Sequence, residues 1–166
     1  MNSAYFHRLA RYNAWANRRL YDACAQLSVP DYQAKRPSFF GSIHETLNHI
    51  LVGDRVWLSR FESRPSGIKS LDEILYDDLA ALRAAREAED AHILRYVGTL
   101  DDDLMSRTLR YRNMAGEPQE TPLAWTLAHF FNHQTHHRGQ VHGMLSGTPV
   151  APPSLDLIYF LREDRA

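Results

Sequence analysis

Residues 132–142 read NHQTHHRGQVH and hold four of the chain's nine histidines. His133 and His137 stand four positions apart, which on a helix places both imidazole rings on one face, about 40° apart. Two rings in that arrangement can bind one metal ion, whereas His136 and His142 point away from that face. The segment therefore indicates either part of a metal site or a solvated, histidine-rich face.

The apolar residues of the same stretch favour the metal site. On a helical wheel with His133 at zero, the large apolar side chains fall between about 60° and 120°. They are Leu123, Leu127, Phe130, Val141 and Leu145. His137 lies inside this core-facing arc and His133 lies at its edge. Two imidazoles at such positions would be costly to bury without partners, so a shared metal ion explains them better than chance does.

A tight site needs a third ligand, which should come from another helix. The candidates are His7, His44, His49 and His92. His49 stands near Thr46 and Gly53, whose small side chains leave room for an ion. His44 falls in the first turn of its expected helix. Both rings lie well off the apolar arc of that helix, His44 by about 90° and His49 by about 130°, so spacing alone leaves the third ligand open.

Other metal architectures are excluded by the spacing of their motifs. HQTHH lacks the glutamate of the HExxH zinc-protease motif, and HETLNH has a different spacing. A di-iron bundle requires two Glu-x-x-His elements, and only EDAH, from Glu89 to His92, matches one. We therefore expect a site with one metal ion, built on histidines.

The elements that must position these rings are expected to be helices almost throughout. Four long helices are predicted, over about residues 3–27, from 42 to near 63, over 70–97 and over 121–147. Ser42 with Glu45 forms a capping box that opens the second helix. Ser70 with Glu73 repeats this pattern for the third, and Gly98 is expected as its left-handed cap.

The remaining segments complete the expected fold. Thr121 and Pro122 suit the N-cap and the first position of the fourth helix. Residues 100–120 alternate in character around AGEP, which predicts a loop or a small hairpin between helices 3 and 4. The segment SLDLIYFL is expected to form a short terminal helix. The predicted fold class is all-α: an antiparallel four-helix bundle with a short fifth C-terminal helix, in a single domain over residues 1–166.

Composition narrows the class of partner. Nineteen basic and twenty acidic residues give a net charge of -1 without a long run of one sign, which argues against nucleic acid. The N-terminal segment lacks the apolar core of a signal peptide, and no stretch reaches the ~18 apolar residues of a membrane span. We therefore expect a soluble, cytoplasmic protein. The single Cys24 cannot form an internal disulfide and is expected to be a small buried side chain.

On these motifs, the chain resembles the DinB family of DinB/YfiT-like metalloenzymes. The matching segments are YNAWANRRL, LNHILVGDRVWLSRF, NHQTHHRGQVHGML and PPSLDLIYFL, which span nearly the whole chain. The resemblance implies a four-helix bundle whose metal site takes one histidine from the second helix and two from an HxxxH pair on the fourth. Carried over to this chain, the implied ligands are His49, His133 and His137.

A site of this kind is open to chemistry. Three imidazoles leave coordination positions for water or substrate, unlike a structural zinc site with four protein ligands. We expect a divalent ion, first zinc or nickel, with iron or copper also suited to imidazole. The resemblance implies a thiol-dependent transferase or isomerase that uses a low-molecular-weight thiol against a small electrophile, or alternatively a metal-binding stress-response protein without turnover. It also implies a homodimer. The residues themselves identify no general acid or base.

Three further side chains are candidates for supporting the site. Asp54 falls at the centre of the second helix's apolar arc and needs hydrogen-bond partners there. The first helix offers three: Tyr12, Asn13 and Arg18. We expect Asp54 to have a structural role and not a catalytic one, since structural support is the stronger expectation. Gln140 and His129 flank the ligand face and could bond the second nitrogen of an imidazole.

Two glycines and three larger side chains complete the candidates. Gly139 and Gly143 lie one turn apart on the fourth helix. Glycine inside a helix costs about 1 kcal/mol relative to alanine, so this pair indicates a close backbone contact, with either the terminal helix or a second subunit. Tyr111, Arg112 and Trp125 could line the mouth of the site, although an ordinary core or solvated role is the stronger expectation.

Overall fold

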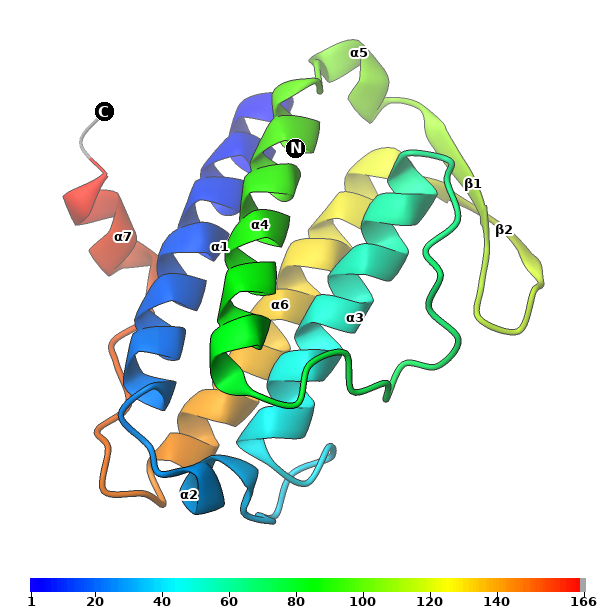
Figure 1. The fold of residues 1–166 in the computed structure, drawn as a ribbon. Coiled ribbons are helices and arrows are strands. Elements are labelled where there is room, and N and C mark those ends of the chain that lie inside the picture. Colours follow the sequence, from blue (N-terminus) through cyan, green and yellow to red (C-terminus); the bar gives the residue numbers. More distant parts are fainter. Residues whose placement is uncertain (165–166) are drawn as a thin grey trace.

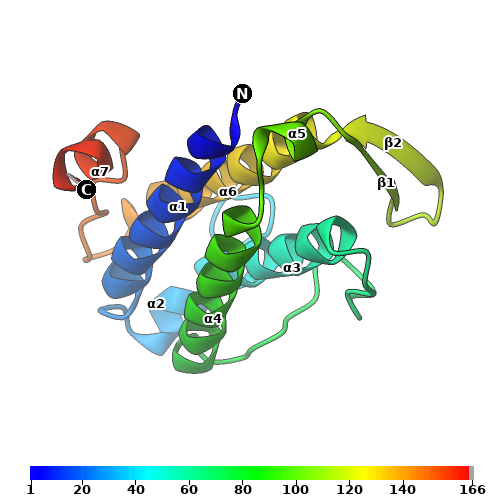
Figure 2. The same cartoon turned by 90° about the horizontal axis from the view of Figure 1, so that it is seen from above.

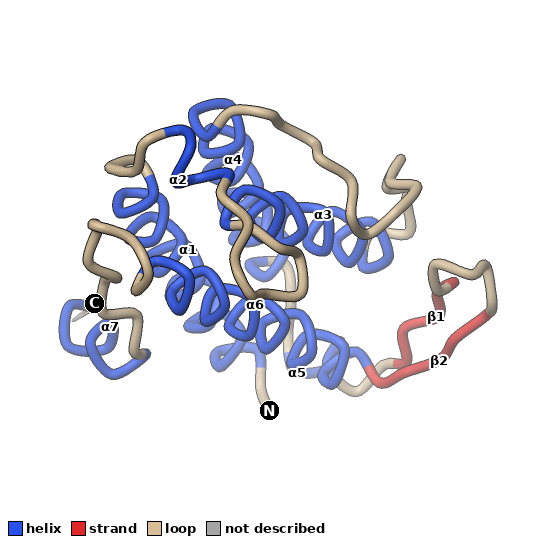
Figure 3. The backbone as a smooth tube through the Cα atoms, turned by 90° about the horizontal axis from the view of Figure 1, so that it is seen from below, coloured by secondary structure: helices blue, strands red, loops and turns tan. Residues whose placement is uncertain are grey.

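The structure of the protein, a computed structural model, describes residues 1–164 (Figure 1). Its elements are α1 (Ser3–Cys24), α2 (Val29–Gln33), α3 (Ile43–Phe61), α4 (Leu79–Gly98), α5 (Asp102–Met105), β1 (Thr108–Arg112), β2 (Pro118–Pro122), α6 (Leu123–Leu145) and α7 (Leu157–Glu163). The prediction of a mostly helical fold is confirmed. A hairpin of β1 and β2 stands where a loop or hairpin was expected, and it extends away from the helices (red in Figure 3).

The four long helices lie side by side, but they do not all alternate in direction. α1 packs against α4 and α6, and α3 packs against the same two helices (Figure 2). Contacts of Asp54 with Arg86 and of Glu62 with His92 join α3 to α4 with both residue numbers rising together, so these two helices are parallel. The expected antiparallel arrangement is therefore wrong for this pair. Residues 62–78, which we call the crossover segment, carry the chain back along α3 before α4 begins (Figure 1).

The start of α4 corrects a second expectation. The helix begins at Leu79 and not after Ser70. Glu73 does accept hydrogen bonds from the backbone N–H groups of Lys69 and Ser70, but these bonds close a turn inside the crossover segment. Asp78 is the N-cap, and its carboxylate accepts a backbone N–H three residues on at 2.8 Å. The same local pattern thus serves a turn at one site and a helix at another.

Three other helix ends were predicted from local signals, and the start of α3 is the one that follows its signal. Ser42 caps α3 and accepts the N–H of Glu45 at 3.1 Å, which confirms the expected N-cap; the Glu45 carboxylate accepts from the Ser42 hydroxyl at 2.9 Å, in place of the backbone N–H that a capping box uses. At α6, the expected N-cap at Thr121 is wrong by one residue, because Thr121 lies in β2 and Pro122 takes the N-cap position without a side-chain bond. Gly98 ends α4 in a helical conformation, so the expected left-handed cap is wrong.

The interior between the long helices contains two apolar clusters separated by a polar layer. One cluster lies toward α2, and the other lies toward the hairpin. Between them, seven polar or charged side chains are at least nine-tenths buried, and we call them the buried polar layer: Asn13, Asn17, Asp54, Arg86, Asp90, Gln134 and Arg138. Ionic groups at the centre of a fold need partners in fixed positions, so this layer constrains how the helices are rotated.

Two expectations about individual groups are answered by the fold. Cys24 is buried, and burial raises the pKa of its thiol to about 12, so it is an unreactive core side chain as expected. Across the described residues, no helix combines the length and the apolar character needed to span a membrane.

Gly139 and Gly143 make no close backbone contact with another part of the described chain. A Cβ atom built at either position would have no neighbour within 4 Å among the described residues. The expected contact with the terminal helix is therefore wrong, because α7 packs on α1 through Phe160. A contact of these glycines with a second subunit stays a prediction.

Candidate metal centre

Three histidine rings from two helices meet at one point. His49 lies on α3, and His133 and His137 lie on consecutive turns of α6. The Nε2 atom of His49 lies 3.2 Å from the Nε2 of His133 and 3.2 Å from that of His137. One ring nitrogen from each residue lies within 4.8 Å of the others, and among residues 1–164 no other His, Cys, Asp or Glu side chains form such a cluster. The structure thus brings together the three side chains expected as ligands.

The tautomer of His49 follows from its partner in the crossover segment. Its Nδ1 lies 2.8 Å from the backbone carbonyl of Leu71. A carbonyl only accepts hydrogen bonds, so the neutral ring must carry its proton on Nδ1. The Nε2 of His49 is then an unprotonated nitrogen with its lone pair toward the other two rings.

His137 is oriented in the same way by a side chain of its own helix. Its Nδ1 lies 2.8 Å from Oε1 of Gln140, while the amide nitrogen of Gln140 lies 3.3 Å from Nε2 of His136. With that orientation of the amide, Nδ1 of His137 donates and its Nε2 is left with a free lone pair. The expectation that Gln140 bonds the second nitrogen of an imidazole ligand is confirmed.

Gly53 leaves the space that the ring of His133 fills. A Cβ built on Gly53 would lie only 2.8 Å from Cε1 of His133, well inside van der Waals contact. On the other side of the cluster, the ring of Phe40 stacks on His49 with the centroids 3.9 Å apart and meets His137 edge-on at 5.5 Å. The ring of His133 therefore fits against the bare backbone of Gly53, and the ring of Phe40 covers His49 and His137.

Burial keeps the three imidazoles neutral. Burial lowers the pKa of His49. Burial, with a smaller effect from the neighbouring rings, lowers the pKa of His133 to about 3 and that of His137 to about 4. The hydrogen bonds that Leu71 accepts from His49 and that Gln140 accepts from His137 oppose this only in part. Since neutral imidazole is the form that binds metal, the rings are ready to act as ligands near neutral pH.

The spacing of the ring nitrogens suits a common ion. Imidazole nitrogens bind zinc at about 2.0–2.1 Å, which in tetrahedral geometry places two ligand nitrogens about 3.3–3.4 Å apart. The observed separations of 3.2 Å lie close to that value. With lone pairs of His49 and His137 facing each other at this distance, the cluster fits a divalent cation at its centre, and such an ion would have coordination positions left for water or substrate.

The histidines considered as alternative ligands have other roles. His44 bonds the carbonyl of Tyr76 at 3.0 Å, which fastens the crossover segment. His92 lies 2.6 Å from a carboxylate oxygen of Glu62. His7 is likewise outside the three-histidine cluster. Spacing had left these possibilities open, and the packing of α3 against α6 removes them.

Asp54 has partners other than the expected ones. It accepts hydrogen bonds from Arg86 on α4 and Gln134 on α6, and none is recorded from the first helix within the described residues. Burial raises the pKa of Asp54 to about 7 although Arg86 opposes this effect. For Arg86, the attraction of Asp90 and Asp54 outweighs burial and holds its pKa above the usual range. Asp54 is thus a member of the buried polar layer, as its expected structural role requires.

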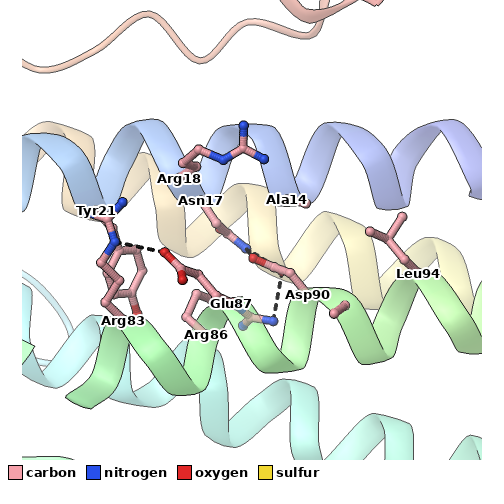
Figure 4. Close-up of a pocket in the computed structure, with 10 residues that line it drawn as sticks. Ala14, Asn17, Arg18, Tyr21, Arg83, Arg86, Glu87, Asp90 and Leu94 are labelled. Carbon is pink, nitrogen blue, oxygen red and sulfur yellow. Dashed lines mark hydrogen bonds and ion pairs between the residues drawn. The ribbon is translucent and has the colours of Figure 1, made fainter. Parts of the chain in front are cut away.

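A cavity of about 400 Å³ between α1 and α4 opens onto the same layer (Figure 4). Asp90 lies on its wall, where it accepts from Asn17 at 2.9 Å and lies 3.0 Å from Arg86. Arg83 and Glu87 form an ion pair nearer the solvent. These charged groups bond one another and none of the three clustered histidines lines the cavity, so we assign the polar residues there a structural role.

An aromatic row continues from His133 toward the hairpin. The ring of His129 lies 5.9 Å from that of His133 and 5.1 Å from that of Trp57, and Tyr111 lies 5.3 Å from Trp57. No hydrogen bond between His129 and His133 is found in the described structure, so the expected support from His129 is not present. Trp125 is 65% exposed, which leaves Tyr111 as the aromatic candidate nearest to this row.

Two contributors to the site were missed from the sequence. Phe40 belongs to the FFGS segment before the capping box, and an aromatic pair preceding a helix was the available signal. The carbonyl of Leu71 has no signal at all, because a backbone group is present at every residue. Asn48 helps to hold that carbonyl in place, since its side chain accepts the N–H groups of Leu75 and Tyr76 at 2.9 and 3.0 Å.

The fold and the site together define a helical protein with a buried three-histidine cluster that can hold a metal ion. The model of the DinB family matches residues 1–165, so the chain belongs to the DinB family. It is also 28% identical over 166 residues to Protein DinB of Bacillus subtilis (strain 168), and the alignment covers 96% of each chain.

Proposed function

We propose that His49, His133 and His137 bind one divalent metal ion through their Nε2 atoms and that the protein is a metal-dependent enzyme. One observation carries this proposal: the Nε2 atoms of His49 and His137 face each other at 3.2 Å while both Nδ1 atoms are committed to hydrogen-bond acceptors. Two lone pairs at that separation repel each other. A cation between them converts the repulsion into two bonds.

The ligand set supports a metal ion that acts on a substrate. Three neutral imidazoles leave the full double positive charge of the ion and at least one open coordination position. Such an ion polarises an oxygen atom or lowers the pKa of a bound water or thiol. Zinc and nickel are the ions we propose first, and iron and copper are also compatible with an all-imidazole site.

The surroundings of the rings favour a thiol over water as the nucleophile. Within the described chain, the recorded contacts of the three histidines include no carboxylate side chain. Zinc hydrolases of the HExxH type use a glutamate as general base to activate water, whereas a thiol has a pKa near 8.5 and needs only the metal ion to become a thiolate. A bound ion would therefore stabilise a low-molecular-weight thiol as thiolate, its proton passing to solvent. The thiolate would form a bond from sulfur to a small electrophile, whose displaced electron pair leaves with the leaving group or is protonated by solvent.

Metal content and thiol chemistry can be tested separately. We expect protein purified without a histidine tag to contain about one divalent ion per chain by elemental analysis, and His133→Ala to contain none. His142→Ala, on the same helix and outside the cluster, is the matched control. A wild-type protein that takes up no ion from solutions of zinc, nickel, iron or copper would overturn the proposal.

Turnover is the second measurement. Bacillithiol, mycothiol and glutathione are each offered to the metal-loaded protein with a model electrophile, and we expect thiol-dependent loss of the electrophile with at least one of them. The activity should be absent in His133→Ala. Tight metal binding without turnover for any thiol would reject the enzyme and leave a metal-binding protein.

A further inference from the structure

A second cavity lies next to the candidate metal centre and is strongly basic. We call it the hairpin cavity. It has a volume of about 550 Å³ between the C-terminal half of α3, the start of the crossover segment and the β1–β2 hairpin. Its lining includes five cationic residues and no acidic residue: Arg60, Arg64, Lys69, Arg110 and Arg112. The chain as a whole has slightly more acidic than basic residues, so this concentration of positive charge is local.

Three of these cations have no acidic partner among residues 1–164. Two of the five form ion pairs with glutamates outside the lining. No carboxylate of the described residues lies within ion-pair distance of Arg60, Lys69 or Arg112. Arg112 donates to the carbonyl of Gly116 at 2.6 Å, which orients its side chain without neutralising it. Uncompensated positive charge around a cavity attracts an anion.

Arg60 is the most firmly held of the three. Its guanidinium lies 4.6 Å from the ring centre of Trp57 and 5.0 Å from that of Tyr111. Burial lowers its pKa, because the charge has left water without gaining an acidic partner. A planar guanidinium fixed by two aromatic rings presents its N–H groups in the geometry that suits a carboxylate or a phosphate.

The hairpin cavity and the three-histidine cluster lie along one face of α3, with Arg60 on the cavity wall and Gly53 against His133. Gly53, Trp57 and Arg60 recur at intervals of three and four residues, so they share that face. Seven residues of helical rise separate Gly53, which contacts His133, from Arg60, a distance of about 10 Å. The aromatic row of His129, Trp57 and Tyr111 lies between the cluster and the cavity, and Tyr111 is part of the cavity wall.

We propose that the hairpin cavity binds the anionic end of a small substrate, a carboxylate or a phosphate group, while the reactive end of the same molecule lies at the three-histidine cluster about 10 Å away. The link to the cluster rests on the proposed function, but anion binding in the cavity does not. The volume falls within the roughly 300–1,000 Å³ of small-molecule sites. The substrate is therefore an elongated anion with its reactive atom remote from its charge.

Anion binding is tested on the metal-free full-length chain, with succinate and inorganic phosphate as probes and calorimetry at low salt as the readout. We expect saturable binding of at least one of them, about tenfold weaker in Arg60→Gln and about threefold weaker in Lys69→Gln. Arg95→Gln, which removes an exposed cation from α4, should bind as wild type does. If Arg60→Gln fails to fold, Lys69→Gln and Arg112→Gln carry the test, since both side chains are exposed.

Absence of saturable binding, or equal affinity in all variants, overturns the anion site. Tighter binding of a short single-stranded oligonucleotide than of either small anion would also overturn it, because the basic surface would then be a nucleic-acid site. Metal binding by wild type is unaffected by either result. If the protein binds the anions but takes up no metal ion, the proposed metal-dependent function is rejected and the anion site stands.

The connection between the two sites needs a probe with two ends. Glutathione carries a thiol and two carboxylates, and its diethyl ester keeps the thiol and the ammonium group without the two negative charges. We expect the metal-loaded chain to bind glutathione at least tenfold more tightly than the ester, and Arg60→Gln to remove that preference. Equal binding of the acid and the ester by wild type would overturn the link.

Discussion

Replacing Gly53 with alanine should weaken metal binding without unfolding the protein. The new Cβ would lie 2.8 Å from Cε1 of His133, whereas ordinary van der Waals contact begins at 3.4 Å. The ring must therefore retreat by about 0.6 Å, and a metal–ligand distance tolerates only about 0.2 Å. His133 cannot keep its place in the cluster while the methyl group is present.

Folding and metal binding are expected to respond in opposite directions. In the metal-free protein the ring of His133 can turn away, because Cε1 is at the far end of a rotatable side chain. Alanine in a helix interior is also favoured over glycine by about 0.5–1 kcal/mol. Metal-free Gly53→Ala should thus be as stable as wild type or slightly more stable. Its affinity for metal should fall about 10- to 100-fold, the range seen when the surroundings of a ligand are disturbed.

Two measurements separate these effects. Binding of Co²⁺ is followed by visible absorbance in competition with a chelator, and the stability of the metal-free protein is followed by urea unfolding. Gly139→Ala is the matched control, since a Cβ there meets nothing within 4 Å among the described residues. If Gly53→Ala binds the ion as tightly as wild type and the control do, the reasoning is refuted, because His133 would not be confined by this glycine in the bound state.

Three other outcomes are expected. Gln140→Leu should lower metal affinity about tenfold in the same competition assay, because the amide fixes the tautomer of His137; an unchanged affinity would contradict this role. In the metal-free protein, the folded-state pKa values of about 3 for His133 and about 4 for His137 lie below their ordinary value of 6.5. Their contribution to stability is therefore fully present above about pH 6.5 and is lost as the pH falls toward 4, by about 2 kcal/mol between pH 7 and pH 5 after allowance for solvent screening. Urea unfolding at both pH values measures this, and the loss should shrink when both rings are replaced by alanine. Asp54→Ala should cost about 3 kcal/mol in urea unfolding, because Arg86 would stay buried with Asp90 as its remaining carboxylate partner and the amide of Gln134 would lose its acceptor; a loss below about 1 kcal/mol would argue against a buried ion pair of Asp54 with Arg86.

The helical part of the site could be predicted because its signals are local. The four-residue spacing of His133 and His137 and the apolar arc beside them depend only on the geometry of one helix. The N-cap at Ser42 is equally local, and it begins α3 as expected. At Ser70 the same type of signal failed, because the side chain of Asn48 bonds the backbone just beyond it and holds the crossover segment extended. A contact across 27 residues leaves no trace in a local pattern.

The third ligand and the partners of Asp54 could not be derived from the residues for the same reason. The helical wheel placed His49 about 130° from the apolar arc of its helix, which normally indicates a solvated position. His49 is nevertheless 5% exposed, because the crossover segment covers that side of α3 through the carbonyl of Leu71. Asp54 was expected to meet the first helix. Because α3 packs against α4 and α6, its partners come from those helices, as Arg86 does.

The three-histidine cluster and the buried polar layer are built from the same helical turns. Gly53 is followed directly by Asp54, and His133 is followed directly by Gln134. Successive residues of a helix point about 100° apart, so one member of each pair faces the interior and the other faces the metal cluster. The hydrogen bond from Gln134 to Asp54 fixes the rotation of α6 against α3, and that rotation places His133 opposite Gly53. Apolar contacts alone would let a helix rotate about its axis at a small cost in free energy. Rotating either helix here would leave a buried charge without its hydrogen-bond partner. The ionic groups in the core thus hold the ligand rings at the separation that a metal ion requires.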